Sequence, residues 1–95
     1  MRTDLPTGEV TLVFTDIEGS TRLLHELGPD AYAAELAEHR RIVREAFGPR
    51  GGIEVDTQGD AFFIAFPSAP QAVAAAREAT DALARGRVRI RIGIH

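Results

Sequence analysis

The sequence lacks two features that would narrow its class: it has no cysteine and no long apolar run. Without cysteine, the chain can form neither a disulfide framework nor a thiolate metal site. Its longest uninterrupted apolar run, AFFIAF, is far too short to span a bilayer. The opening residues MRTDLPTGE lack the apolar segment of a signal peptide. These absences predict a cytoplasmic protein without a membrane segment.

A basic excess is also missing, because 11 lysine and arginine residues stand against 14 aspartate and glutamate residues, for a net charge of −3. Nucleic-acid-binding domains normally carry a positive electrostatic footprint, so we expect no nucleic acid partner. The chain does have 44% apolar residues over a length of 95, which is enough for one modest core. We therefore expect a leader at residues 1–8 and one domain over residues 9–95.

The pattern of apolar residues predicts the element order β-α-α-β-β-α-β. Strands are expected where apolar and β-branched residues run together or alternate, and helices where apolar residues recur at helical spacing between capping signals. The expected strands are 10–15, 53–57, 61–66 and 87–95, and the expected helices are 20–27, 30–47 and 69–84. The apolar run of the first strand is typical of a strand covered on both faces.

With right-handed crossovers, this order predicts an α+β, ferredoxin-like palm: an antiparallel four-stranded sheet with helices on one face. The third strand then lies between the first and second, which run parallel, so Asp16 and Asp60 face each other at one end of the sheet. Two adjacent carboxylates repel each other unless a cation lies between them, and hard oxygen ligands favour Mg²⁺ or Mn²⁺. The pair therefore predicts a metal site.

The loop Glu18-Gly19-Ser20-Thr21 follows the first aspartate and leads into a helix. The first N–H groups of a helix have no partner inside it, and such a terminus attracts phosphate. Free amides beside an acidic metal site predict that a nucleoside triphosphate binds here through its phosphates.

Each of these features also has an ordinary structural interpretation. An aspartate after a strand is a common turn residue, and Gly19-Ser20-Thr21 is more often a helix N-cap than a phosphate cradle. The inner face of its helix predicts that His39 is a packed, hydrogen-bonded core residue, while His25 and His95 have no ligand partners at metal spacing. The arginines of 87–95 predict a solvated strand edge, or less often a contact with phosphate or a partner chain.

Four stretches together resemble a known family: VTLVFTDIEGSTRLL, AELAEHRRIVREAF, VDTQGDAFFIAF and VRIRIGIH. In this order they are similar to the N-terminal half of a class III adenylate/guanylate cyclase catalytic domain. The resemblance implies a lyase that converts ATP or GTP to cyclic 3′,5′-AMP or cyclic 3′,5′-GMP plus pyrophosphate, using two Mg²⁺ or Mn²⁺ ions.

The resemblance also implies a role for each matching position. Asp16 and Asp60 match the catalytic, metal-binding aspartates, and Ile17 matches a residue whose backbone carbonyl also binds metal. The triphosphate loop is matched by Glu18, Gly19, Ser20 and Thr21. Active sites of the family form between two such domains, which implies a homodimer or a dimer with another cyclase domain.

The chain departs from the family pattern in two respects. Asp56 stands where adenylate cyclases usually place a purine-reading lysine and guanylate cyclases a glutamate, which leaves ATP and GTP both open. The family's second purine-reading residue and its asparagine–arginine pair lie beyond the position of His95. We therefore expect the metal- and phosphate-binding half of a cyclase domain, inactive alone.

Two alternatives stay open. One is a non-catalytic nucleotide-sensing or dimerisation module of a larger signalling regulator. The other is a diguanylate cyclase, which we rank last because QGDAFF replaces the Gly-Gly-acidic-acidic-Phe hairpin of that family.

Overall fold

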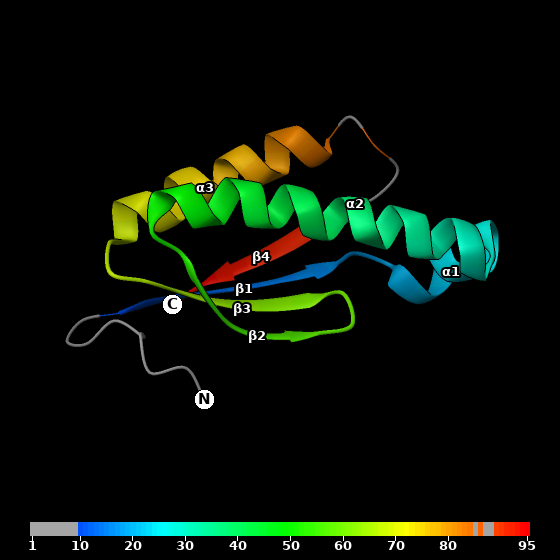
Figure 1. The fold of residues 1–95 in the computed structure, drawn as a ribbon, viewed down its shortest axis with the longest axis horizontal. Helices are drawn as coiled ribbons and strands as arrows, with labels where there is room; N and C mark the ends of the chain where they lie inside the picture. Colours follow the sequence, from blue (N-terminus) through cyan, green and yellow to red (C-terminus); the bar gives the residue numbers. More distant parts are fainter. Residues whose placement is uncertain (1–9, 85, 87–88) are drawn as a thin grey trace.

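The computed structural model describes residues 10–84, 86 and 89–95. The strands are β1 (Thr11–Ile17), β2 (Ile53–Gln58), β3 (Ala61–Phe66) and β4 (Ile90–Ile94). The helices are α1 (Ser20–Leu27), α2 (Pro29–Phe47) and α3 (Ala69–Leu83), with a short 3-10 turn, η1 (Gly48–Arg50), after α2. The order β-α-α-β-β-α-β and the α+β fold expected from the sequence are confirmed (Figure 1).

The sheet is antiparallel, with the strand order β2-β3-β1-β4. Because β3 lies between β1 and β2, those two strands run parallel, as the topology predicted. Thr15 of β1 faces Phe62 of β3, and Asp16 faces Arg91 of β4. The end of β1 therefore lies between the β2–β3 hairpin and the start of β4.

The helices α2 and α3 lie side by side over one face of the sheet (Figure 1). The core fills the space between these two layers, and its largest members are the buried rings of Phe47, Phe62 and Phe66. On α3 the buried positions are mostly alanine, at 72, 75, 76 and 79. Small side chains let this helix pack closely on the sheet.

The opposite face of the sheet, here called the open face, carries no helix (Figure 1). The expectation that β1 is covered on both faces is therefore wrong within the described residues. Val13, Thr15 and Ile17 are buried under the helices, whereas Leu12 on the other face is 51% exposed. Phe63 of the neighbouring strand β3 is likewise 40% exposed. An apolar run shows that a strand is apolar on both sides, but not what covers each side.

Several element boundaries differ slightly from the expectation. Helix α2 begins at Pro29, one residue early, because proline fits the first position of a helix. A register shift between Glu54 and Asp56 marks a β-bulge in the edge strand β2, which the alternation alone did not predict. The proposed leader, residue 9, and residues 85, 87 and 88 at the expected helix–strand junction lie outside the described residues. In the part of the chain that the structure describes, no helix combines the length and apolar character of a membrane span.

Candidate functional site

Asp60 meets the end of β1, as the topology predicted. It follows Gly59 in the tight turn between β2 and β3, where the positive φ of Gly59 (58°) suits glycine. From this turn its Oδ2 accepts a hydrogen bond from the backbone N–H of Ile17 at 3.1 Å. The carboxylate thus lies beside the residue that follows Asp16, although 43 positions separate it from Ile17 in the sequence.

Asp16 extends from the open face of β1, because its neighbours Thr15 and Ile17 are the buried ones. Its side chain is 18% exposed, whereas that of Arg91, its ion-pair partner, is 62% exposed. Arg91 donates from Nε to Oδ1 and from Nη2 to Oδ2, each at 2.8 Å. Both oxygens of this predicted metal ligand are therefore held by an arginine.

Arg91 lies on an edge strand and its side chain is 62% exposed, as expected for a solvated edge, but it also pairs with Asp16, which the sequence interpretation did not include. Its pKa is raised, chiefly by the hydrogen bonds and charge of Asp16 and further by the charges of Glu18 and Asp60. The guanidinium therefore experiences all three carboxylates at this end of the sheet. The alternation of arginine and apolar residues predicted that Arg91 lies on the polar face of its strand. Only the register of β4 on β1 shows that Asp16 lies on the same face.

The loop between β1 and α1 supplies the amides of the predicted phosphate site. Gly19 is the N-cap of α1 in the left-handed conformation (φ 64°), and no side chain caps this helix among the described residues. The N-cap alternative for Gly19-Ser20-Thr21 is therefore met by Gly19, although no serine or threonine oxygen of this stretch caps the helix. Glu18 and Gly19 line a hollow of about 360 Å³ whose other walls include Arg22 and Arg89. This arrangement leaves the first turn of α1 available to an anion.

Tyr32 of α2 is affected by groups of both the loop and the hairpin. Its pKa is raised by burial and then by the negative charge of Asp60, while Ser20 and the charge of Arg40 oppose the shift. A side chain of α2 is therefore affected by Ser20 of the phosphate loop and by Asp60 of the hairpin.

His39 of α2 is completely buried and packs beside Phe62, with ring centroids 6.4 Å apart. This agrees with the packed core position expected from the sequence. The expected hydrogen bond is not found, because neither ring nitrogen has a partner in the described part of the chain. Burial lowers the pKa of His39, and the charge of Asp60 opposes that shift.

Asp56 lies apart from the two other aspartates but on the same face of the sheet as Asp16. It pairs with Phe63, which in turn faces Phe14 of β1 with ring centroids 5.2 Å apart. Its carboxylate accepts from the Thr57 N–H and from Gln58 Nε2, both at 2.9 Å. The open-face hollow beside it has a volume of about 530 Å³, and its apolar walls come from residues Leu12, Phe14, Val55 and Phe63.

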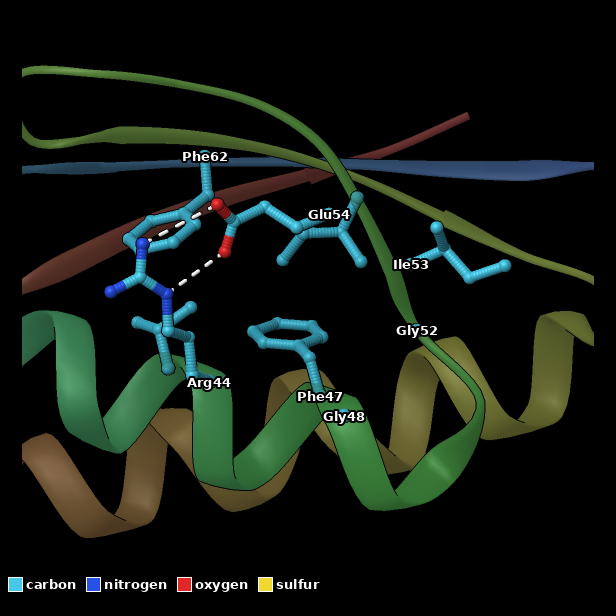
Figure 2. A pocket seen from close by; sticks show the side chains of 9 residues that line it. Arg44, Phe47, Gly48, Gly52, Ile53, Glu54 and Phe62 are labelled. Atoms are coloured by element: carbon cyan, nitrogen blue, oxygen red, sulfur yellow. Dashed lines mark hydrogen bonds and ion pairs between the residues drawn. The ribbon is translucent and has the colours of Figure 1, made fainter. Parts of the chain in front are cut away.

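A second hollow, of about 240 Å³, lies between α2 and β2 on the helix-covered face. Figure 2 shows Arg44 rising from α2 to meet Glu54 of β2 through two hydrogen bonds, of 2.9 and 3.3 Å. The guanidinium also lies 5.3 Å from the centre of the Phe62 ring. The neighbouring side chains of Phe47 and Phe62 are 2% and 0% exposed, so this is a packed helix–strand contact. None of the predicted site residues lines it.

Known proteins resemble this chain both in sequence and in fold. The adenylate cyclase of Lachancea kluyveri is 50% identical to this chain over 68 residues, which are 72% of this chain but 4% of that protein. An adenylate cyclase from Trypanosoma brucei, solved in its monomeric state, superposes with a TM-score of 0.87 and 27% identity. That alignment covers 99% of this chain and 60% of the other.

The guanylate cyclase domain of RhGC from Catenaria anguillulae, solved in complex with GTP, superposes with a TM-score of 0.79 over 90% of this chain and 54% of that one. At 21% identity, this likeness concerns the fold alone. The sequence profile of one family matches nearly the whole chain, from residue 3 to residue 95. The chain belongs to the adenylate and guanylate cyclase catalytic domain family.

Proposed function

We propose that these residues form the metal- and phosphate-binding half of a purine nucleotide cyclase domain. Such a domain converts ATP or GTP to the cyclic 3′,5′ nucleotide and pyrophosphate. The hydrogen bond from the Ile17 N–H to Asp60 Oδ2, at 3.1 Å, carries the proposal. It brings the hairpin aspartate to the end of the strand that bears Asp16 and that continues into the phosphate loop.

The donors at this end of the sheet fit Mg²⁺ or Mn²⁺. The carboxylates of Asp16 and Asp60 and the carbonyl of Ile17 are hard oxygen donors. Across the described ranges, no three histidine, cysteine, aspartate or glutamate residues gather into a metal-binding group. Magnesium commonly takes one or two protein carboxylates and completes its shell with water and substrate phosphates, so the two aspartates would be enough for it. Two bound ions would activate the ribose 3′ hydroxyl and stabilise the departing pyrophosphate.

Arg91 has a part in this proposal that the sequence did not reveal. Arg91 competes with a cation for Asp16, because its guanidinium takes one lone pair of each carboxylate oxygen and repels a second positive charge. In this proposal the guanidinium moves away when the metal binds. A released Arg91 remains beside the Glu18 loop, where a bidentate guanidinium can bind a phosphate group. The amides from Glu18 to Thr21 would bind the same phosphates from the helix terminus.

The open-face hollow would receive the purine. Phe14 and Phe63 offer apolar ring surfaces, and Asp56 at the margin accepts hydrogen bonds when ionised. An acceptor suits the N–H edge of guanine better than N1 of adenine, yet aspartate is one methylene shorter than glutamate. Both ATP and GTP therefore belong in the test.

The chain spans 4% of the fungal relative and 60% of the trypanosomal structure. Its 95 residues contain no asparagine, so the asparagine–arginine pair implied by the family resemblance is not among them. We propose that this half binds nucleotide in the cytoplasm, as one member of a homodimer or of a dimer with another cyclase domain, and does not turn it over alone. The departure from the family pattern at Asp56 favours a nucleotide-sensing or dimerisation module as the second candidate.

Labelled ATP and GTP test the proposal in two steps, with Asp16→Ala as the site variant and Asp81→Ala, an exposed position on α3, as its control. We expect weak binding that depends on Mn²⁺, is lost in Asp16→Ala and is kept in Asp81→Ala. No cyclic product should form, because losing one donor to the transition state costs about 10²- to 10³-fold and several are missing.

Absence of metal-dependent binding to the unchanged chain would contradict the proposed function. Cyclic product that disappears in Asp16→Ala would instead contradict the account of this half as inactive alone. A chain extended through the remaining strands of the family would separate the two candidates, since only the enzyme forms product.

A further inference from the structure

One arginine of α2 makes a contact unlike those of its neighbours. Arg41 pairs with Glu38 and Glu45 on the exposed side of the helix. Arg40 instead donates from Nη2 to the backbone carbonyl of Gly59, in the turn between β2 and β3. Its Nε is buried, with no hydrogen-bond partner among the described residues. Burying part of a guanidinium is costly, so the buried Nε distinguishes Arg40 from the exposed Arg41, although the contact with Gly59 lies at the surface.

The turn that Arg40 reaches carries Asp60. Gly59 has a positive φ, and the next residue sends its carboxylate to the Ile17 N–H at the end of β1. The turn is therefore held from two sides, by α2 through the Gly59 carbonyl and by β1 through the carboxylate. A shift of that carbonyl would move Asp60, because the two groups are adjacent in the chain.

Arg40 and Asp60 also act on the same surroundings with opposite sign. The charge of Asp60 raises the pKa values of Tyr32 and His39, and that of Arg40 lowers both. Arg40 and Asp60 therefore both lie within electrostatic range of the same two side chains. Partners that orient a metal ligand without touching the metal commonly matter for affinity.

We propose that Arg40 is a positioning residue of the metal site, which holds the hairpin turn so that Asp60 is presented beside Asp16. The inference rests on the proposed function, since it assumes that these aspartates share a metal. Arg40 touches neither metal nor substrate in this account and acts through the Gly59 carbonyl alone.

Mn²⁺ affinity, measured from the electron paramagnetic resonance signal of the free ion, tests the inference. Three variants are compared with the unchanged chain: Arg40→Met, Arg40→Lys and the neighbouring control Arg41→Met. We expect Arg40→Met to weaken Mn²⁺ binding about tenfold, the lower end of the range for such second partners. Arg40→Lys should regain part of this loss, because an ammonium can donate to the same carbonyl, and Arg41→Met should bind Mn²⁺ at least as tightly as the unchanged chain.

Loss of the positive charge and loss of the Gly59 contact are expected to change the Mn²⁺ affinity in opposite directions. Either methionine variant removes one positive charge, and a more negative protein should attract a cation more strongly. Equal or tighter Mn²⁺ binding by Arg40→Met would therefore overturn the inference, as would equal losses in Arg40→Met and Arg41→Met.

Hydrogen exchange of the Ile17 amide gives a readout that needs no metal. Releasing the turn should speed exchange at Ile17 in Arg40→Met while the buried core amide of Phe62 keeps its protection. Unchanged exchange at Ile17 would overturn the inference. If Arg40→Met does not fold, Arg40→Lys is compared with Arg41→Lys by the same two measurements. Absence of Mn²⁺ binding in the unchanged chain would contradict the metal site of the proposed function and this inference with it, whereas a normal unchanged chain and a normal Arg40→Met contradict the inference alone.

Discussion

Arg91 on β4 holds both carboxylate oxygens of Asp16 on β1, each at 2.8 Å, across a directly paired position of the sheet. An arginine on these oxygens lowers the negative charge and the number of lone pairs that Asp16 offers to a cation. Arg91 and a metal ion are therefore expected to compete for Asp16.

Arg91→Met should bind Mn²⁺ a few-fold more tightly than the unchanged chain, because the competitor for Asp16 is gone. The same variant should bind triphosphate more weakly in the presence of Mn²⁺, because a phosphate-binding guanidinium is lost. Free-Mn²⁺ resonance and labelled nucleotide measure the two effects. Arg77→Met, on the exposed side of α3, is the charge-matched control. If Arg91→Met and Arg77→Met changed Mn²⁺ and nucleotide binding alike, the cause would be the net charge and not the contact with Asp16.

Asp60→Asn should weaken Mn²⁺ or Mg²⁺ binding and leave the metal-free fold about as stable as before. Repulsion between two bare carboxylates would predict a gain in stability. Here Asp16 already has Arg91 as its partner, and an asparagine oxygen can still accept from the Ile17 N–H. Thermal melts with and without metal measure both parts. An equal metal-induced shift in the unchanged chain and Asp60→Asn would count against the site, and Asp81→Asn controls for the lost charge.

The free energy of unfolding should fall as the pH drops below about 6.5, the ordinary pKa of histidine. Burial lowers the pKa of His39 in the folded state, so the unfolded chain binds the proton more readily in this range. The contribution of neutral His39 is thus complete above the unfolded pKa and is lost as the pH falls toward the folded one.

Urea unfolding at pH 7.5 and pH 5.5 checks this dependence, with His39→Leu as the test variant and exposed His25→Gln as the control. His39→Leu should show a smaller loss of stability between the two pH values, since the titrating group is absent. It should also cost little at pH 7.5, because both ring nitrogens already lack partners. A pH dependence identical in the unchanged chain and His39→Leu would contradict this prediction.

Gly52→Ala should destabilise the fold by about 1–3 kcal/mol, the usual cost of overpacking a closed site. A Cβ at this position would lie 2.7 Å from Cζ of Phe66 and 2.8 Å from the backbone oxygen of Phe47. Gly48→Ala is the matched control, because its Cβ would meet nothing within 4 Å and its backbone is helical. That variant should be neutral or more stable by about 0.4–1 kcal/mol. Equal unfolding midpoints in urea for both variants would contradict the packing argument.

Local patterns in the sequence determined the elements of this protein and their order. Apolar periodicity, the Gly28-Pro29 stop and the Ser68 cap are short-range signals, and short-range sterics and hydrogen bonding suffice to interpret them. The ferredoxin-like order then placed the end of β1 and the β2–β3 hairpin together, because chain connections in such folds have few allowed arrangements. The meeting of Asp60 with the end of the strand that bears Asp16 was within reach of the sequence for that reason.

The tertiary structure alone decided which charges surround those aspartates. The pairing of Asp16 with Arg91 depends on the register of β4 on β1, and a shift of one residue would turn Arg91 to the other face. The contact of Arg40 with the Gly59 carbonyl depends on how α2 lies over the hairpin. The unpaired nitrogens of His39 depend on which side chains close around it. Register and packing are set by contacts between residues far apart in the chain, and a single sequence does not show which of these residues meet.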